Sequence, residues 1–249
     1  MGEVLVLDVG NTHLHWSRWQ ADQCLDSGRV PVVDVDDWQD RLSKYSGVPT
    51  VIGSVGVSGR SMAEFLQRSG HPVQLLERGD AFPLDADVAE VQTVGVDRLA
   101  GALGAFELSQ AAAITADVGT AITVDWIDSH GVFRGGAIVP GRRLALRALS
   151  AGTLQLPELS LWGTEVIQAM PGRDTQGAIR AGVDVGQVGL IERLIESLRE
   201  LAGPSTACWL TGGDAEWFLA RTRLPVHHEP LLVARGLKAA GKRLAENGA

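Results

Sequence analysis

The sequence predicts an α/β protein made of two similar halves, each a mixed β-sheet flanked by helices. The first observation is a repeat: Val4–Thr12 and Ile114–Thr120 both read as an apolar strand, then Asp-Val-Gly, then a turn with threonine. The second is the alternation of strand and helix patterns after each copy. The third is the length of 249 residues, which suffices for two small α/β domains. Because a repeat at this spacing is typical of domains, we place them at residues 1–111 and 112–249.

The composition argues against nucleic-acid and membrane partners. The net charge is −8 and no run of basic residues occurs, whereas a phosphate backbone is bound by clustered lysine and arginine. No apolar stretch reaches the roughly 18–20 residues of a membrane span. Glu3, with no basic residue before it, does not fit a signal peptide. Cys24 and Cys208 lack the spacing of a metal site, so a reducing, cytoplasmic location is expected.

The first half is predicted to open with antiparallel strands. Residues 3–8 form an apolar strand, and Leu14 and Trp16 alternate with polar residues as in a half-buried strand. A turn at Ala21–Gln23 leads to a third strand over residues 25–33. Because hairpins connect these strands, the sheet is expected to be mixed.

Helices and further strands complete this half. The pattern predicts helices over 36–46 and 60–69, and strands over 50–53 and 73–76. The glycine-serine loop at 54–59 is interpreted as a plain strand–helix connection, with phosphate binding as the alternative. Residues 77–94 break the pattern and are expected to form a surface or substrate-facing loop.

The second half repeats the order of strands and helices. Strands are predicted over 112–117, 120–126, 132–139, 207–211 and 225–227. A long helix is predicted to start at Asp174-Thr175 and to reach about Leu201, with a break near Gly186. Shorter helices are predicted over 144–149 and 230–247.

The two Asp-Val-Gly turns are predicted to bind phosphate. Glycine lets the backbone approach an anion, and exposed N–H groups with a threonine hydroxyl donate to phosphate oxygens. Aspartates at strand ends, here Asp8 and Asp117, can hold Mg²⁺ directly or through water. His13 and His15 share a strand face, where a position facing solvent or phosphate is favoured over a metal pair.

Two further segments carry candidate site residues. Asp97 and Arg98 start a helix after the irregular loop. An aspartate there also suits a helix cap, but the helix dipole disfavours an arginine, so a structural and a functional interpretation both stay open. Thr211–Asp214 places Gly-Gly between a strand and a helix, as in nucleotide sites and also in ordinary turns.

Together these motifs resemble the type III pantothenate kinases, in the superfamily of acetate and sugar kinases, heat-shock chaperones and actin. The resemblance covers nearly the whole chain and implies two ribonuclease H-like (actin-like ATPase) domains. Seven short motifs occur in the family's order: Asp8-Val9-Gly10-Asn11-Thr12, Gly95-Val96-Asp97-Arg98, Asp117-Val118-Gly119-Thr120-Ala121, Gly135–Gly141, Thr153–Pro157, Asp174-Thr175 and Thr211-Gly212-Gly213.

The resemblance implies an activity and its partners. The reaction is the ATP-dependent phosphorylation of pantothenate to 4′-phosphopantothenate, the first step of coenzyme A biosynthesis. The cofactors are ATP with Mg²⁺ and a monovalent cation, K⁺ or NH₄⁺. The assembly is a homodimer whose sites lie near the subunit interface.

The resemblance also implies roles for single residues. Asp97 is the general base, Arg98 binds the substrate carboxylate beside Gly95 and Val96, and Thr175 completes the pantothenate pocket across the interface. The metals are bound by Asp8, Asp117 and Asp125, the last for the monovalent cation. ATP is bound by Asp8, Val9, Gly10, Asn11, Thr12, His13, Gly119, Thr120, Gly212 and Gly213.

These roles fit the chemistry of phosphoryl transfer, which needs positioning and charge neutralisation. A carboxylate near a primary hydroxyl accepts its proton, and arginine offers a carboxylate two parallel N–H donors. One segment departs from the family, which usually has a tyrosine and then Asn-Pro or Asp-Pro before Gly-x-Asp-Arg; residues 87–93 hold neither an aromatic residue nor a proline. The pocket is therefore expected to be looser or built differently, with Trp162 and the 77–93 loop as candidate replacements.

Two other functions stay open. One is a catalytically weak regulatory or accessory protein on the same scaffold, which the divergent 87–93 loop permits. The presence of Asp8, Asp97, Arg98 and Asp117 argues against it. The other is a small-molecule kinase or nucleotide hydrolase with a different acceptor.

Overall fold

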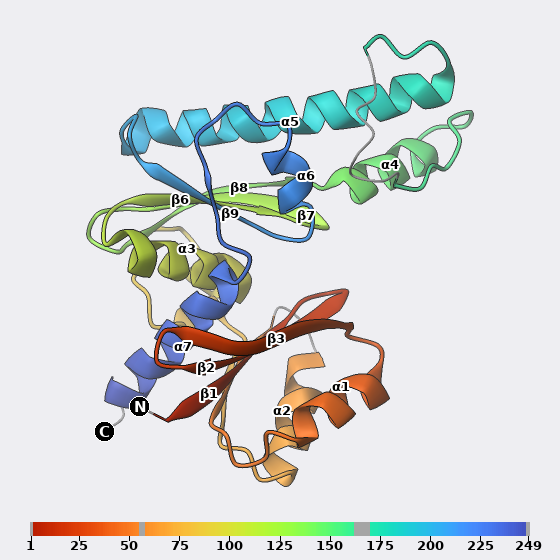
Figure 1. The fold of residues 1–249 in the computed structure, drawn as a ribbon. Coiled ribbons are helices and arrows are strands. Elements are labelled where there is room, and N and C mark those ends of the chain that lie inside the picture. Colours follow the sequence, from red (N-terminus) through yellow and green to blue (C-terminus); the bar gives the residue numbers. More distant parts are fainter. Residues whose placement is uncertain (1, 55–57, 162–169, 248–249) are drawn as a thin grey trace. The chain divides into compact units, whose positions relative to one another are not determined.

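The computed structural model describes residues 2–54, 58–161 and 170–247 (Figure 1). The chain divides into two compact units. The first comprises Met1–Ala111, Ser129–Arg134 and Leu231–Ala249, and the second comprises Ala112–Asp128 and Gly135–Pro230. Within the described ranges, no helix combines the length and the apolar character that a membrane crossing requires.

Both five-stranded sheets have the same topology. The first has the order β3-β2-β1-β4-β5, from the strands β1 (Glu3–Val9), β2 (His13–Gln20), β3 (Gln23–Pro31), β4 (Thr50–Ser54) and β5 (Val73–Leu76). The second has the order β8-β7-β6-β9-β10, from β6 (Ala113–Val118), β7 (Ala121–Ile127), β8 (Phe133–Pro140), β9 (Ala207–Thr211) and β10 (His227–His228). In each, the first strand pairs antiparallel with the second and parallel with the fourth. The predicted mixed sheets are confirmed.

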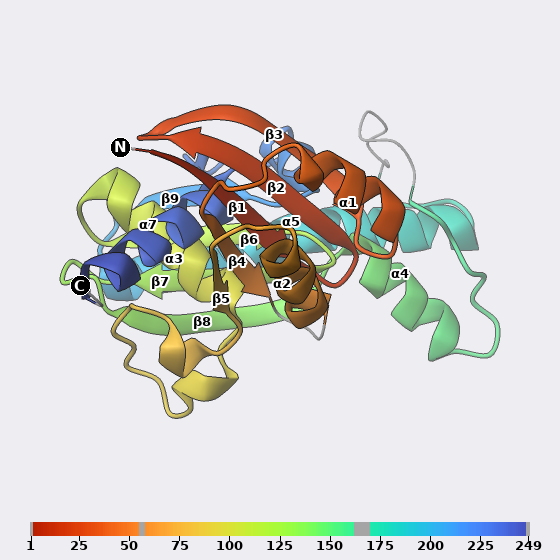
Figure 2. The same ribbon diagram turned by 90° about the horizontal axis from the view of Figure 1, so that it is seen from below.

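Helices α1 (Val35–Ser43) and α2 (Ser58–Arg68) cover one face of the first sheet (Figures 1 and 2). Alternate side chains of β1 and β2 point at them and are buried with residues of both helices, including Leu7, Leu14, Trp38, Leu42 and Leu66. Burying each large apolar side chain contributes roughly 1.5–3 kcal/mol, so this contact holds the two helices on the sheet.

The last helix of the chain, α7 (Leu232–Asn247), packs in the first unit against β1, β4 and α3 (Val96–Ser109). The two helices approach so closely that a Cβ on Gly236 would lie 1.7 Å from the Ala100 carbonyl oxygen, and one on Gly104 would lie 2.3 Å from that of Leu232. The division at residue 111 assigned this helix to the second domain. In the structure, its contacts with β1, β4 and α3 place the helix in the first unit. Glycines on α3 and α7 permit the close approach of these two helices.

The second unit buries its sheet under the long helix α5 (Thr175–Ala202) and the short helix α6 (Ala215–Leu219). Helix α4 (Arg142–Ala151) lies along the first half of α5 (Figure 1). The predicted break near Gly186 is wrong, since α5 is continuous for 28 residues. A glycine inside a helix costs about 1 kcal/mol, and buried neighbours such as Val183, Ile191 and Ile195 outweigh that cost.

The irregular segment predicted at 77–94 contains the short 3₁₀ helices η1 (Gly79–Ala81) and η2 (Val91–Thr93). Ala86 forms a parallel bridge with Phe133 in the hairpin tip at 129–134, which belongs to the same unit. Residues 55–57 of the 54–59 loop, and the candidate Trp162, lie outside the described residues.

Candidate active site

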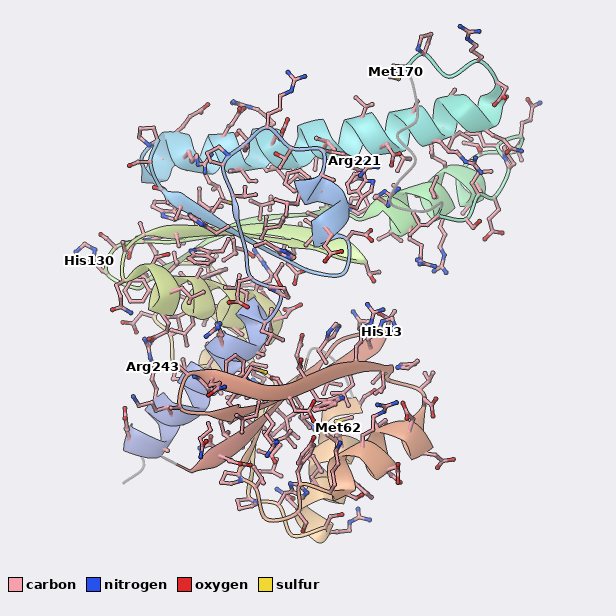
Figure 3. All side chains as sticks on the ribbon, viewed as in Figure 1. His13, Met62, His130, Met170, Arg221 and Arg243 are labelled. Carbon is pink, nitrogen blue, oxygen red and sulfur yellow. The ribbon has the colours of Figure 1, made fainter. Side chains whose placement is uncertain are left out.

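The first Asp-Val-Gly segment forms a tight turn between β1 and β2. The Gly10 N–H donates to the His13 carbonyl oxygen at 3.0 Å. The Thr12 hydroxyl lies 3.1 Å from Nδ1 of His13, whose side chain Figure 3 shows at the start of β2. Asn11 and Thr12 are exposed, whereas Asp8 is half-buried at the end of β1. The turn thus presents polar side chains next to a carboxylate, in the first unit.

The second Asp-Val-Gly segment forms a tighter turn between β6 and β7. Here the Gly119 N–H donates to the Ala121 carbonyl oxygen at 3.1 Å. The Gly141 N–H, just before α4, donates to the Thr120 carbonyl oxygen at 3.0 Å. A Cβ on Gly141 would lie 2.0 Å from the Gly119 carbonyl oxygen, so only glycine fits there. The Pro-Gly segment before α4 therefore holds the second loop in place.

The Gly-Gly turn after β9 lies against this second loop. Gly212 has a φ of +99°, and a Cβ there would lie 2.4 Å from Oδ1 of Asp117 and 2.5 Å from the Val118 carbonyl oxygen. The Asp214 N–H donates to that same carbonyl at 2.8 Å. The structure therefore brings Asp117, the Gly119-Thr120 loop and the Gly212-Gly213 turn together within the second unit.

Asp125 is fully buried on β7, opposite Thr115 of β6. A Cβ on Gly136 would lie 2.5 Å from Oδ1 of Asp125 and 2.0 Å from the Val124 carbonyl oxygen. Carboxylate oxygens are ligands that hard cations prefer. Among the described residues, no group of three or more His, Cys, Asp and Glu could hold a metal ion by itself. Single carboxylates at Asp8 and Asp117 still fit Mg²⁺, which is usually held by one or two carboxylates and the substrate's phosphates.

Asp97 lies in the first turn of α3, where the cap position is occupied by Gly95 without a side-chain cap. Its Oδ1 accepts the Arg98 N–H at 2.9 Å. Burial raises the pKa of the Asp97 carboxyl, and this effect exceeds the opposite effects of the Arg98 N–H and the Arg98 charge. Asp97 therefore lies within the first turn and not at the cap position, and its raised pKa makes its carboxylate a better proton acceptor than an ordinary aspartate.

An aromatic ring lies beside Arg98, next to the segment at 85–87. The Arg98 guanidinium is 5.6 Å from the ring centroid of Phe133, which is fully buried. The Phe133 N–H donates to the Asp85 carbonyl oxygen at 2.8 Å, and the Asp87 N–H donates to the Phe133 carbonyl oxygen at 2.9 Å. Asp87 also forms an ion pair with Arg134. The segment at 85–87 is thus hydrogen-bonded to the hairpin tip, and the Phe133 ring of that tip lies under Arg98.

Thr175 is the first residue of α5 and is exposed. The Asp174 side chain caps the helix by accepting the Gly177 N–H at 2.7 Å. The first unit therefore carries the Asp8–His13 turn and Gly95–Arg98. The second unit carries Asp117, Gly119, Thr120, Asp125, Thr175, Gly212 and Gly213.

Solved structures with similar folds include a Baf family protein from Campylobacter jejuni, with a TM-score of 0.63 and 20% identity over 97% of this chain and 99% of that one. MreB 5 of Spiroplasma citri, solved with AMPPNP, has a TM-score of 0.50 and 13% identity over 100% of this chain and 99% of that one. At these identities the likeness concerns the fold alone, which is that of the actin-like ATPases.

Sequence comparison identifies the family. A family model described as type III pantothenate kinase matches residues 4–197. The type III pantothenate kinase of Zymomonas mobilis is 36% identical, with 98% of this chain and 96% of the relative covered. That of Halorhodospira halophila is 31% identical, with 94% of this chain and 95% of the relative covered. With a model matching most of its length and relatives of this identity spanning nearly all of it, the chain belongs to the type III pantothenate kinase family.

Proposed function

We propose that this chain transfers the γ-phosphoryl group of ATP to the primary hydroxyl of pantothenate, giving 4′-phosphopantothenate and ADP. The observation that carries the proposal is the start of α3 in a chain of this family. There a carboxyl with a raised pKa, Asp97, precedes an arginine that lies over the Phe133 ring. Pantothenate needs both groups, since it has a hydroxyl to be deprotonated and a carboxylate to be bound.

Asp97 accepts the hydroxyl proton while the hydroxyl oxygen bonds to the γ-phosphorus. The bond from that phosphorus to the bridging oxygen breaks, and ADP leaves with the bonding electrons. A raised pKa supports this role because a stronger base accepts the proton more readily. Arg98 binds the pantothenate carboxylate with parallel N–H donors and, with Gly95 and Val96, holds the hydroxyl end near Asp97.

The phosphate groups of ATP are held by the two Asp-Val-Gly turns and the Gly-Gly turn. The binding residues are Asp8 to His13, Gly119, Thr120, Gly212 and Gly213. Their backbone N–H groups and hydroxyls offer donors to phosphate oxygens. Asp8 and Asp117 are the carboxylates that would hold Mg²⁺, directly or through water, and the ion would supply charge neutralisation at the phosphate oxygens. Asp125 would help to hold the monovalent cation, K⁺ or NH₄⁺.

The protein acts in the cytoplasm as a homodimer. Its acidic charge of −8 is unsuited to a nucleic-acid partner, which would require a basic surface. Thr175, exposed at the start of α5, contributes to the pantothenate pocket of the other subunit.

The test uses purified protein with Mg-ATP and K⁺, with and without pantothenate. The proposal predicts ADP release only when pantothenate is present, with one 4′-phosphopantothenate formed per ADP. Equal ADP release without pantothenate would indicate a hydrolase or a kinase with another acceptor. No turnover, together with a protein partner retained in a pull-down, would indicate the accessory function.

A further inference from the structure

A row of polar side chains crosses the first sheet next to the first phosphate loop. His15 on β2 is paired with Asp8 on β1 and, on its other side, with Arg29 on β3. Directly opposed residues of neighbouring antiparallel strands point to the same face of a sheet. Asp8, His15 and Arg29 therefore project from one face, in line across three strands.

This face is the one opposite helices α1 and α2. The pairs one position away, Val9 with Leu14 and Leu14 with Val30, belong to the core under those helices. The row itself is open, because His15 and Arg29 are exposed and Asp8 is half-buried. Arg29 thus extends from the same surface as the carboxylate of the phosphate loop.

Arg29 lies close enough to that loop for its charge to act on an anion bound there. Neighbouring strands lie about 4.8 Å apart, so the backbones of Asp8 and Arg29 are roughly 10 Å apart, within the combined reach of an arginine side chain and a bound anion. Arg29 supplies the formal positive charge of the row, beside the imidazole of His15.

We infer that Arg29 is a nucleotide-binding residue that extends the first phosphate loop onto β3. Its guanidinium donates to phosphate oxygens of the bound nucleotide, and the His15 side chain, between Asp8 and Arg29, is an adjacent donor. Arginine matches phosphate with two parallel N–H donors and, unlike the backbone N–H groups of the loop, adds a full positive charge. The inference rests on the proposed function in taking ATP as the nucleotide.

The experiment measures binding of Mg-ATP and of Mg-tripolyphosphate to the full chain by calorimetry, without pantothenate. We expect Arg29→Gln to weaken both about tenfold, as the loss of one charge-assisted contact does, and Arg29→Lys to weaken them less. Arg68→Gln is the matched control, because Arg68 is an exposed arginine on α2, over the opposite face of the sheet. It should leave both affinities unchanged, and thermal midpoints should show that all variants fold.

The inference is overturned if Arg29→Gln and Arg68→Gln bind Mg-ATP equally well, or if the parent binds no Mg-ATP. It is also overturned if Arg29→Gln weakens Mg-ATP but not tripolyphosphate, since Arg29 would then act on the nucleoside. If the parent does not phosphorylate pantothenate, but Arg29→Gln still weakens the binding of Mg-ATP, then the proposed function alone is rejected.

Discussion

Asp97 has a raised carboxyl pKa and lies in the first turn of α3. If it is the base, Asp97→Asn removes the proton acceptor while keeping the size of the side chain. We expect the rate of pantothenate phosphorylation to fall by about 10²–10⁴-fold, with Mg-ATP binding unchanged. Turnover near the parent rate would show that another group takes the proton.

The same substitution should change stability in a pH-dependent way. Because burial raises the folded-state pKa of Asp97, the folded protein binds this proton more tightly than the unfolded chain. The parent therefore loses stability as the pH rises from the usual aspartate pKa of about 3.9 through the raised value. Asparagine has no such titration, so the variant should melt at a higher temperature than the parent near pH 7. The difference should vanish in acid, below both pKa values, and a constant difference across this range would contradict the assignment.

Phe133 is the residue-level feature that the motifs did not reveal. Phe133→Leu keeps an apolar core residue but removes the ring under Arg98, an interaction worth about 0.5–2 kcal/mol. If Arg98 binds the substrate carboxylate, the KM for pantothenate should rise roughly two- to thirtyfold, with the KM for ATP unchanged. Phe65→Leu is the control, since Phe65 packs on Trp38 in the core of the same unit. An equal rise in both variants would mean that general loosening, not the ring, is the cause.

At the scale of elements, the Gly-Gly turn after β9 packs against the second Asp-Val-Gly loop. Gly212→Ala would strain a backbone with positive φ and push a Cβ into Asp117 and Val118. We expect a loss of about 1–3 kcal/mol in the free energy of unfolding and a clear loss of Mg-ATP affinity. Gly203→Ala is the matched control. Gly203 lies at the end of α5 and also has a positive φ, +109°, but a Cβ added there would lie no closer than 3.7 Å to another residue. Unchanged ATP affinity in Gly212→Ala would separate this turn from the nucleotide site.

Elements with local signals were the ones that the sequence could predict. The strand β1, the turn after it and the strand β6 follow from apolar runs that end in Asp-Val-Gly, and the mixed sheets follow from the hairpins. The predicted break in α5 at Gly186 failed because tertiary packing of the helix outweighs the local cost of glycine.

Features that depend on distant pairing could not be predicted. Phe133 meets Arg98 only because the segment at 85–87 pairs with the hairpin tip, and nothing local to either segment signals it. Arg29 lies opposite His15 only through the register of β2 and β3. The position of α7 on α3 depends on glycines in both helices, whose meaning is clear only once the helices are in contact.

At the scale of the whole molecule, the sequence repeat is a repeat of topology. In both sheets the Asp-Val-Gly turn follows the central strand, whose neighbours are an antiparallel second strand and a parallel fourth strand. The copies differ beside the aspartate: Asp8 is paired with His15, whereas Asp117 is paired with Thr123. The row that includes Arg29 is therefore a feature of the first unit, and the Gly-Gly turn packs on the loop of the second.

The proposed homodimer can be tested by mixing two inactive subunits. If each site takes Asp97 from one subunit and Thr175 from the other, Asp97→Asn and Thr175→Gln chains are both inactive as pure dimers. A hybrid dimer then has one site with both defects and one with neither, so about half of the parent activity per dimer should return. Thr175 is exposed at the first position of α5, where a glutamine is tolerated by the helix, so loss of folding is not the expected cause of inactivity. Co-expression with two different affinity tags isolates the hybrid, and tagged parent dimers give the reference rate. A hybrid without activity would place both residues in the site of a single subunit, and failure to isolate any hybrid would argue against a dimer.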